Sequence, residues 1–285
     1  MANPYPVPDH GTLAWIRAVL GADPGTPVAL TGGTAQAVWL VPAADGREYV
    51  MRQWSRPGWR ESDPHHSPEN ELAALTALAA TGLPVPEVVA CDAAGEHGDH
   101  PALLMTRLPG HIASSATYRV PGDPPMTPDM IRQLTEAAQV VHGLAVPAVG
   151  PYEPYGDLSG AEPPEGTSRP ELWELAFETV LSGPPAAPEV FVHRDFHPGN
   201  TLWLDGRLSG LIDWTTAARG PAGVDYGHLR WNLVAAYGLE TAGSVLRHAP
   251  DYHPYWDLRT VADAAELVED LPLFERYLDS VLSRI

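Results

Sequence analysis

The chain of 285 residues is 44% hydrophobic and contains nine Trp, which indicates a folded protein with room for one large domain or two lobes. Its formal charge of −19 argues against nucleic-acid binding and suits either a cationic small molecule or a soluble acidic surface. The single cysteine, Cys91, excludes an internal disulfide and a cysteine zinc site, and it favours a reducing compartment.

The first ten residues have neither the basic region nor the apolar core of a secretory signal. No apolar stretch along the chain approaches the length of a membrane span. We therefore expect a cytoplasmic protein that has no membrane partner.

Turn and periodicity signals in the first hundred residues predict a sheet with two helices. One helix is expected over 12–20, where Thr12 can cap the first turn and Gly21 ends the pattern. Another starts at Ser67-Pro68, with Ser as the cap and Pro in the first turn, and it stops at Gly82. Five strands are expected at 28–31, 37–41, 48–54, 85–90 and 102–106.

Helices predominate after Leu108-Pro109-Gly110, so we expect two domains, 1–108 and 109–285. The expected helices cover 127–143, 170–181, 226–237, 241–248 and 258–282, the last as one or two, and a Pro/Gly-rich loop covers 144–170. Short strands are expected at 189–192, 201–204 and 208–212. Asp205-Gly206 is a strong hairpin signal between the last two. An antiparallel hairpin there would bring Asn200 close to Asp213.

The most specific pattern is the run His193-Arg194-Asp195-Phe196-His197-Pro198-Gly199-Asn200, followed by Ile212-Asp213-Trp214. Phosphoryl transfer requires one carboxylate beside the attacking hydroxyl, and an amide and a carboxylate that hold Mg²⁺. Asp195 suits the first role, while Asn200 and Asp213 suit the second. An alternative is a metal cluster of His193, Asp195 and His197, because His and Asp also ligate zinc. That alternative leaves Asn200 and Asp213 unexplained.

These residues make the chain resemble the aminoglycoside phosphotransferase (APH) family, small-molecule kinases with a protein-kinase-like fold. The His at position 197 and the Trp at position 214 favour this family over protein kinases. The resemblance extends over nearly the whole chain and includes Thr31-Gly32-Gly33-Thr34, Tyr49-Val50-Met51-Arg52, Glu71-Leu72-Ala73-Ala74-Leu75, Gly82-Leu83-Pro84-Val85-Pro86 and Leu103-Leu104-Met105. It implies a bilobal α+β fold, in which an N-terminal lobe with a five-stranded antiparallel sheet and a helix precedes a larger, mainly helical lobe with a catalytic β-hairpin.

The resemblance also implies a nucleotide site in the first lobe, with ATP or GTP as phosphate donor and Mg²⁺ as cofactor. Backbone N–H groups of Gly32, Gly33 and Thr34 would approach the triphosphate. The hinge whose backbone pairs with the purine would comprise Met105, Thr106, Arg107 and Leu108.

Arg52 departs from the family pattern, which usually has a Lys that contacts the α and β phosphates. All 17 basic residues of the chain are Arg, which also excludes a Walker A phosphate loop. Arg keeps the charge but is longer, planar and forked. We expect Arg52 to fill the role, held by Glu71, with Glu69 as the competing partner.

These patterns predict a phosphotransferase that moves the γ-phosphate of ATP or GTP to a hydroxyl of a small molecule. Residues 251–285 carry eight carboxylates and three Arg, which favours an amine-bearing acceptor such as an aminoglycoside. Macrolides, amino alcohols and sugars remain open as acceptors. Arg52 leaves open a nucleotide-binding pseudokinase or regulatory module, and the His/Asp cluster leaves open a metal-dependent hydrolase.

Overall fold

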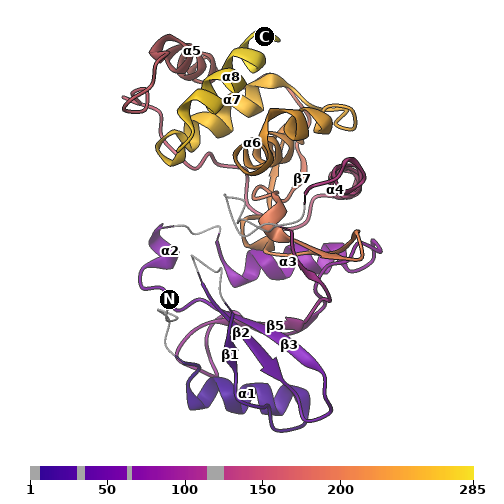
Figure 1. Ribbon diagram of the computed structural model, residues 1–285. Helices are drawn as coiled ribbons and strands as arrows, with labels where there is room; N and C mark the ends of the chain where they lie inside the picture. Colours follow the sequence, from indigo (N-terminus) through magenta and orange to yellow (C-terminus); the bar gives the residue numbers. More distant parts are fainter. Residues whose placement is uncertain (1–6, 31–35, 63–65, 114–124) are drawn as a thin grey trace. The chain divides into compact units, whose positions relative to one another are not determined.

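The computed structural model describes the chain except for residues 1–6, 31–35, 63–65 and 114–124. The chain divides into two compact units (Figure 1). The first unit comprises Met1–Gly110, Pro147–Val149 and Ser209–Ala217, and the second comprises His111–Val146, Gly150–Leu208 and Ala218–Ile285. The domain boundary after Leu108 stays a prediction. No sequence pattern indicated that the segment 209–217 would group with the first unit.

The first unit is built on a five-stranded sheet of order β1-β2-β3-β5-β4, in which all neighbours are antiparallel. This confirms the expected sheet. Its central strand, β3, carries Arg52, which lies opposite Val38 of β2 and Leu103 of β5. The strands are β1 (Val28–Ala29), β2 (Ala37–Pro42), β3 (Glu48–Gln53), β4 (Val88–Asp92) and β5 (Ala102–Thr106).

Helix α1 (His10–Leu20) covers one face of this sheet, where its Trp15 and Ile16 join a core cluster with Trp39 and Met51. Its predicted start was wrong, because Asp9 and not Thr12 is the cap. The Asp9 carboxylate accepts a hydrogen bond from the backbone N–H of Thr12 at 3.0 Å. Asp is a strong N-cap residue, and it therefore starts the helix two residues earlier.

Helix α3 (Pro68–Leu78) begins where the sequence predicted, with the Ser67 hydroxyl accepting from the N–H of Asn70 at 3.1 Å. It ends at Leu78, before the Gly82 that was expected to stop it. The following strand begins at Val88 and not at Val85. Prolines cannot donate to a sheet ladder, and Pro84 and Pro86 interrupt the expected start. A single-turn helix, α2 (Trp59–Ser62), was not predicted.

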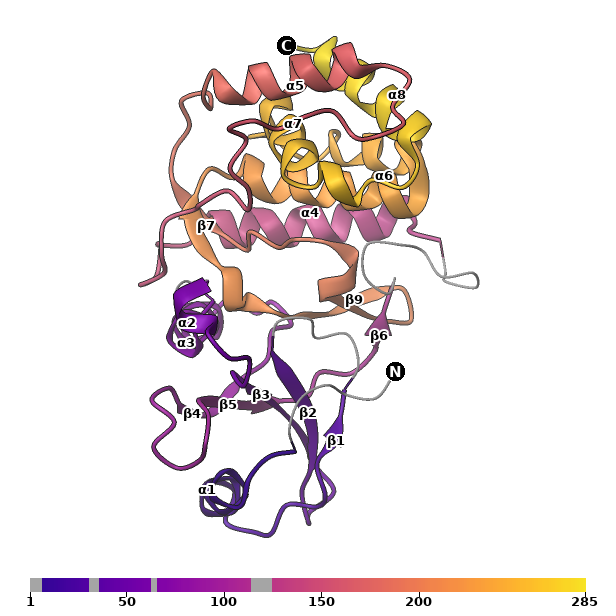
Figure 2. The same cartoon turned by 90° about the vertical axis from the view of Figure 1, so that its left-hand side faces the viewer.

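The second unit is mainly helical. Helices α4 and α5 match the sequence expectation closely, and Thr127 is the N-cap of α4. The two helices expected before residue 248 form one element, α6, with non-helical backbone at Gly238. Figure 2 shows α5, α7 and α8 together in this unit. The helices are α4 (Pro128–His142), α5 (Pro170–Leu181), α6 (Gly223–Val245), α7 (Pro254–Asp263) and α8 (Leu271–Leu282).

Glycines allow α6 and α7 to approach closely. A Cβ added at Gly223 would lie 2.0 Å from Trp256 Cδ1, and one at Gly227 would lie 2.4 Å from the Trp256 carbonyl oxygen. Trp256 therefore occupies space that only glycine leaves on α6. No helix in the described part of the chain is long and apolar enough to span a bilayer.

Short strands complete the structure. Strand β7 (Val190–Val192) pairs with β10 (Ala218–Gly220), and β6 (His111–Ile112) joins β8 (Thr201–Leu204) and β9 (Arg207–Leu211) in the order β6-β8-β9. The turn between β8 and β9 has positive φ at Asp205 (51°) and Gly206 (74°), the geometry that favours a tight hairpin. The hairpin prediction is confirmed, whereas β6 and β10 are too short to leave a sequence pattern.

Candidate active site

The predicted site residues fall in both units, and each group is described within its own unit. Arg52, Glu71 and Asp213 belong to the first unit, while Asp195 and Asn200 belong to the second. Met105 and Thr106 end strand β5, with Arg107 and Leu108 just after it. Gly32, Gly33 and Thr34 lie outside the described residues.

Arg52 is the centre of a buried charge cluster in the first unit. Its side chain projects from β3, where Arg52 Nε lies 3.1 Å from Glu71 Oε2 and Nη1 lies 3.0 Å from Asp213 Oδ1. Gln36 Oε1 accepts a further bond from Nη1 at 3.3 Å. A guanidinium has enough donors to contact several acceptors at once, and here one cation serves two carboxylates.

Helix α3 supplies the partner of Arg52 and also fixes the segment that carries Asp213. The Nδ2 group of Asn70 donates to the carbonyl oxygens of Thr215 (2.9 Å) and Ala217 (2.8 Å). Asp213 itself has a positive φ of 65° and accepts from the Thr215 hydroxyl at 2.7 Å. Glu71 is therefore the acidic partner that the geometry favours, because the competing Glu69 instead forms an ion pair with Arg60 (3.7 Å).

The pKa of Glu71 depends on its burial and on its two charged neighbours, Arg52 and Asp213. Burial, assisted by the nearby negative charge of Asp213, raises the pKa of Glu71 to about 7, although Arg52 opposes the shift. Desolvation disfavours the ionised form of a carboxyl, and one shared cation offsets it only in part. Glu71 can therefore change its protonation state near neutral pH.

Asp225 on α6 holds the loop that carries Asp195 in the second unit. Its carboxylate accepts from the backbone N–H groups of His193 (3.0 Å) and Arg194 (2.8 Å), and its Oδ2 lies 2.8 Å from His142 Nε2. Arg194 adopts a positive φ of 69°, which a residue with a side chain reaches only at an energetic cost. Asp225 therefore anchors this loop.

Asp195 is surrounded by donors. His228 Nε2 lies 2.9 Å from Asp195 Oδ1, and Asn200 Nδ2 donates to Asp195 Oδ2 at 2.9 Å. His197 Nε2 lies 3.6 Å from Oδ1. Burial would raise the pKa of Asp195, but His197 and His228 together hold it well below its ordinary value. Asp195 is thus an ionised carboxylate throughout the neutral range.

His228 was missed by sequence reasoning. It lies one helical turn after Asp225 on α6, so the two side chains project from the same side of the helix. That spacing is the signal that could have identified it. His193, the residue expected in a metal cluster, is 1% exposed and its ring packs beside Phe196.

Asp195, His197 and His228 have ligand atoms close enough together to hold a metal ion. The hydrogen bonding of His197 argues against this use. Its Nδ1 accepts from the N–H of Gly199 at 3.1 Å, so Nε2 carries the ring proton and faces Asp195. Ligation through Nε2 would move that proton to Nδ1, against the Gly199 donor. The geometry therefore favours a hydrogen-bonded carboxylate over a zinc site.

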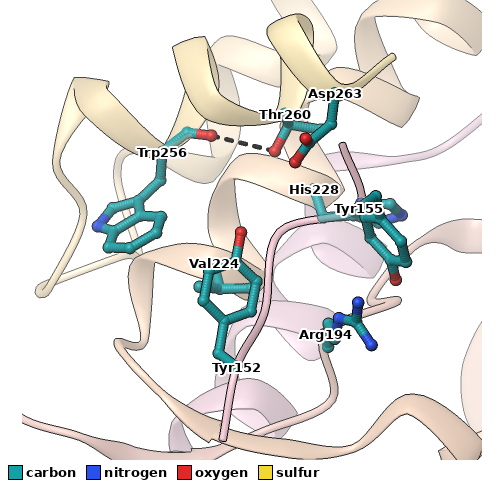
Figure 3. A pocket seen from close by; sticks show the side chains of 8 residues that line it. All are labelled: Tyr152, Tyr155, Arg194, Val224, His228, Trp256, Thr260 and Asp263. Carbon is teal, nitrogen blue, oxygen red and sulfur yellow. Dashed lines mark hydrogen bonds between the residues drawn. The ribbon is translucent and has the colours of Figure 1, made fainter. Parts of the chain in front are cut away.

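A small pocket opens beside these residues in the second unit (Figure 3). Tyr152, Tyr155 and Trp256 provide aromatic walls, and the lining also includes His228 and Arg194. The Tyr152 and Trp256 rings meet edge to face, with centroids 5.9 Å apart. His228, which contacts Asp195, and Arg194, which precedes it in the chain, therefore also line this pocket.

Comparisons with known proteins identify the fold. The macrolide 2'-phosphotransferase MphH from Brachybacterium faecium is 19% identical, with a TM-score of 0.54, and the match covers 94% of this chain and 87% of that one. A thermostable mutant of aminoglycoside phosphotransferase APH(4)-Ia is 16% identical, with a TM-score of 0.63 and coverage of 95% and 98%. The amicoumacin kinase hAmiN is 14% identical, with a TM-score of 0.58 and coverage of 90% and 88%.

A search of curated proteins finds no significant match. The model of the phosphotransferase enzyme family (APH) matches residues 26–258, which is most of the chain. This match confirms both the resemblance found in the sequence and the expected class of enzyme, a small-molecule phosphotransferase. The chain belongs to the APH phosphotransferase family.

Proposed function

We propose that the protein transfers the γ-phosphate of ATP or GTP to a hydroxyl group of a small molecule, with Asp195 beside that hydroxyl. The observation that carries the proposal is the set of contacts that orient Asp195, whose Oδ2 accepts from Asn200 Nδ2 at 2.9 Å and whose Oδ1 lies 2.9 Å from His228 Nε2. Phosphoryl transfer requires positioning and charge stabilisation more than covalent chemistry. A carboxylate fixed in this way suits the orientation of an attacking alcohol.

Asp195 acts mainly by orientation. Its low pKa makes it a weak base, so it accepts the hydrogen bond of the acceptor hydroxyl and directs an oxygen lone pair toward the phosphorus. As the new O–P bond forms, the O–H bond breaks and its proton leaves through Asp195. The bond between the γ-phosphorus and the bridging oxygen breaks, and the nucleoside diphosphate departs.

Arg52 supplies the positive charge for the nucleotide phosphates in this proposal. Its planar guanidinium pairs readily with phosphate oxygens, and the ion pair with Glu71 limits its freedom to move. The segment Gly32, Gly33 and Thr34 would approach the triphosphate, while the residues from Met105 to Leu108 would contact the base. Both assignments rest on the family resemblance.

Asn200 and Asp213 are the proposed ligands of Mg²⁺, which would neutralise negative charge on the transferring phosphate. The chemistry of both side chains fits, because Mg²⁺ prefers hard oxygen ligands. The Asn200 amide nitrogen is committed to Asp195, which leaves Asn200 Oδ1 as the ligand atom. Asp213 offers a carboxylate.

A hydroxylated antibiotic is the first acceptor class to test. The neighbours in the fold comparison include aminoglycoside, macrolide and amicoumacin kinases. The chain's charge of −19 would attract a polyamine such as an aminoglycoside. A panel of aminoglycosides, macrolides, amino alcohols and sugars, incubated with Mg·ATP, should reveal the acceptor by a phosphoryl mass increase.

The matched test compares Asp195→Asn with Asp205→Asn, since Asp205 is an exposed turn residue. We expect Asp195→Asn to lower kcat about 10²–10⁴-fold while Mg·ATP affinity stays unchanged, and Asp205→Asn to leave both unchanged. Asp213→Asn should instead weaken Mg·ATP binding in a calorimetric titration. Full transfer activity in Asp195→Asn would contradict the proposal, and nucleotide binding without any transfer would favour the pseudokinase alternative.

A further inference from the structure

Arg194 is the one buried arginine of the described residues that has no carboxylate partner. Four arginines in this part of the chain are buried, and three of them form ion pairs: Arg52 with Glu71 and Asp213, Arg230 with Asp257, and Arg259 with Asp263. Arg194 is 7% exposed, and its Nε has no hydrogen-bond partner. A buried cation without a partner is costly, so its position requires an explanation.

Contacts of its backbone and its side chain hold Arg194 in this position. Asp225 accepts from its backbone N–H at 2.8 Å and stabilises the positive φ of 69°. The guanidinium carbon lies 4.3 Å from the centroid of the Tyr155 ring, and both side chains line the pocket in Figure 3. Stacking on an aromatic ring occupies the face of a guanidinium and leaves its in-plane N–H groups for a ligand.

The remaining charge of the pocket is already balanced. Asp263 also lines it, but Arg259 pairs with that carboxylate and the Gly156 N–H donates to it at 3.0 Å. The other lining residues that bear polar groups are Tyr, Thr, Trp and His side chains. Arg194 is therefore the side chain whose charge this pocket leaves for a bound molecule to satisfy.

We propose that this pocket binds the acceptor through a carboxylate on Arg194, so that the acceptor is a hydroxylated acid and not a polyamine. The inference rests on the proposed function for the identity of the ligand as the acceptor. A carboxylate accepts two parallel N–H bonds from the guanidinium edge. His228, which contacts Asp195, lies in the same lining, so a molecule held here has its hydroxyl near the reacting carboxylate.

An acidic acceptor differs from the amine-bearing acceptor that the net charge of the chain led us to expect. Long-range attraction by an acidic protein favours amines, but it acts through a screened field. A charge within the pocket acts at contact distance, where the surroundings weaken it less. An ammonium group would be repelled by Arg194 at the position where a carboxylate would be bound.

Matched sets of small molecules that differ in one substituent can test this directly. The first set is glucuronate, glucose and glucosamine, and the second is 4-hydroxyphenylacetate, 4-hydroxyphenylethanol and tyramine. Binding to the full chain is measured by calorimetry without nucleotide, and transfer is then measured with Mg·ATP by product mass. We expect the acid of at least one set to bind about tenfold or more tightly than its alcohol, and the amine to bind most weakly.

Arg194→Gln should lower the affinity for that acid about 10- to 100-fold and change the neutral member by no more than about twofold. Arg276→Gln is the matched control, because Arg276 is exposed on α8. Arg194→Lys keeps the charge, so this variant should still prefer the acid over the amine, with weaker affinity. Its retained preference would show that the loss in Arg194→Gln does not come from a folding defect. Thermal unfolding confirms that each variant is folded.

Tighter binding of the amines, failure of every acid to bind, or an acid affinity that Arg194→Gln leaves unchanged would overturn the carboxylate site. These outcomes differ from a failure of the proposed function. Acid binding that depends on Arg194, without phosphate transfer, would refute the transferase and retain the site. Phosphate transfer to a polyamine, independent of Arg194, would retain the transferase and refute the site.

Discussion

Two charge clusters, one in each unit, shift the pKa of a carboxyl group in opposite directions. In the first unit Arg52 is one cation between two carboxylates, and the pKa of Glu71 rises to about 7 because burial outweighs the shared charge. In the second unit the partly buried Asp195 is one carboxylate among several donors, and its pKa falls well below its ordinary value although desolvation opposes the shift. The ratio of donors to carboxylates thus decides protonation where burial alone would predict the same shift in both.

Removing the single cation should give the largest effect on stability. Arg52→Gln leaves the buried Glu71 and the partly exposed Asp213 without a positive charge, and we expect a loss of about 3–5 kcal/mol at pH 8. The loss should be smaller at pH 5, where Glu71 becomes protonated. Chemical denaturation at both pH values checks this. Arg47→Gln, at an exposed pair with Asp45, is the control and should cause no measurable change.

Removing one donor from the second cluster should have a smaller effect. His228→Ala takes away the donor closest to Asp195 Oδ1, so the free energy of unfolding should fall by about 1.5–3 kcal/mol and the pKa of Asp195 should rise toward its ordinary value. A carboxyl whose pKa is lowered on folding stabilises the folded chain at pH values above the pKa of the unfolded state, and this stabilisation is lost as the pH falls through the folded-state pKa. The free energy of unfolding of the variant should therefore depend less on pH in the acidic range. Carboxyl-carbon NMR titration measures the pKa, with His111→Ala at an exposed site as the control. An unchanged titration would show that His228 does not set the state of Asp195.

Glu71→Gln tests the raised pKa of Glu71 in the first cluster. A carboxyl whose pKa rises from 4.5 to about 7 on folding binds more protons in the folded chain, so stability falls as pH rises through that interval. The Gln variant should lack this fall. Above pH 7 its free energy of unfolding should equal or exceed that of the unmodified chain by about 1–3 kcal/mol. Denaturation curves between pH 4.5 and 8 measure the slope, and parallel profiles for the two proteins would contradict the raised pKa.

The sequence indicated candidate residues of these clusters but not all of their partners. Spacing and residue type pointed to Asp195, Asn200 and Asp213 as candidates, because these residues lie close together along the chain, and their roles stay a prediction. His228 escaped because its contact with Asp195 joins residues 33 positions apart, and only the packed α6 brings them together. The role of Arg194 also depended on packing, since a guanidinium in the sequence does not reveal whether a carboxylate will meet it.

The predicted boundaries of helices and strands were likewise correct where local contacts set them. Starts fixed by a cap next to proline were predicted to the residue, as at Ser67 and Thr127. The start of α1 was wrong because two polar candidates, Asp9 and Thr12, compete within one turn. Local hydrogen bonds can be read from local sequence, whereas pairing partners and charge balance depend on distant segments.

The caps provide the smallest and most local test of whether the two units differ in stability. Ser67→Ala removes the cap of α3 in the first unit, and Thr127→Ala removes the cap of α4 in the second, each at a cost of about 1 kcal/mol. If the units unfold separately, calorimetry should resolve two transitions, and each substitution should lower only its own. Thr179→Ala, at a partly exposed position inside α5, is the control and should lower neither. A single transition lowered equally by both cap variants would mean that the two clusters belong to one cooperative fold, in which the loss of charge balance at Arg52 would also destabilise the surroundings of Asp195.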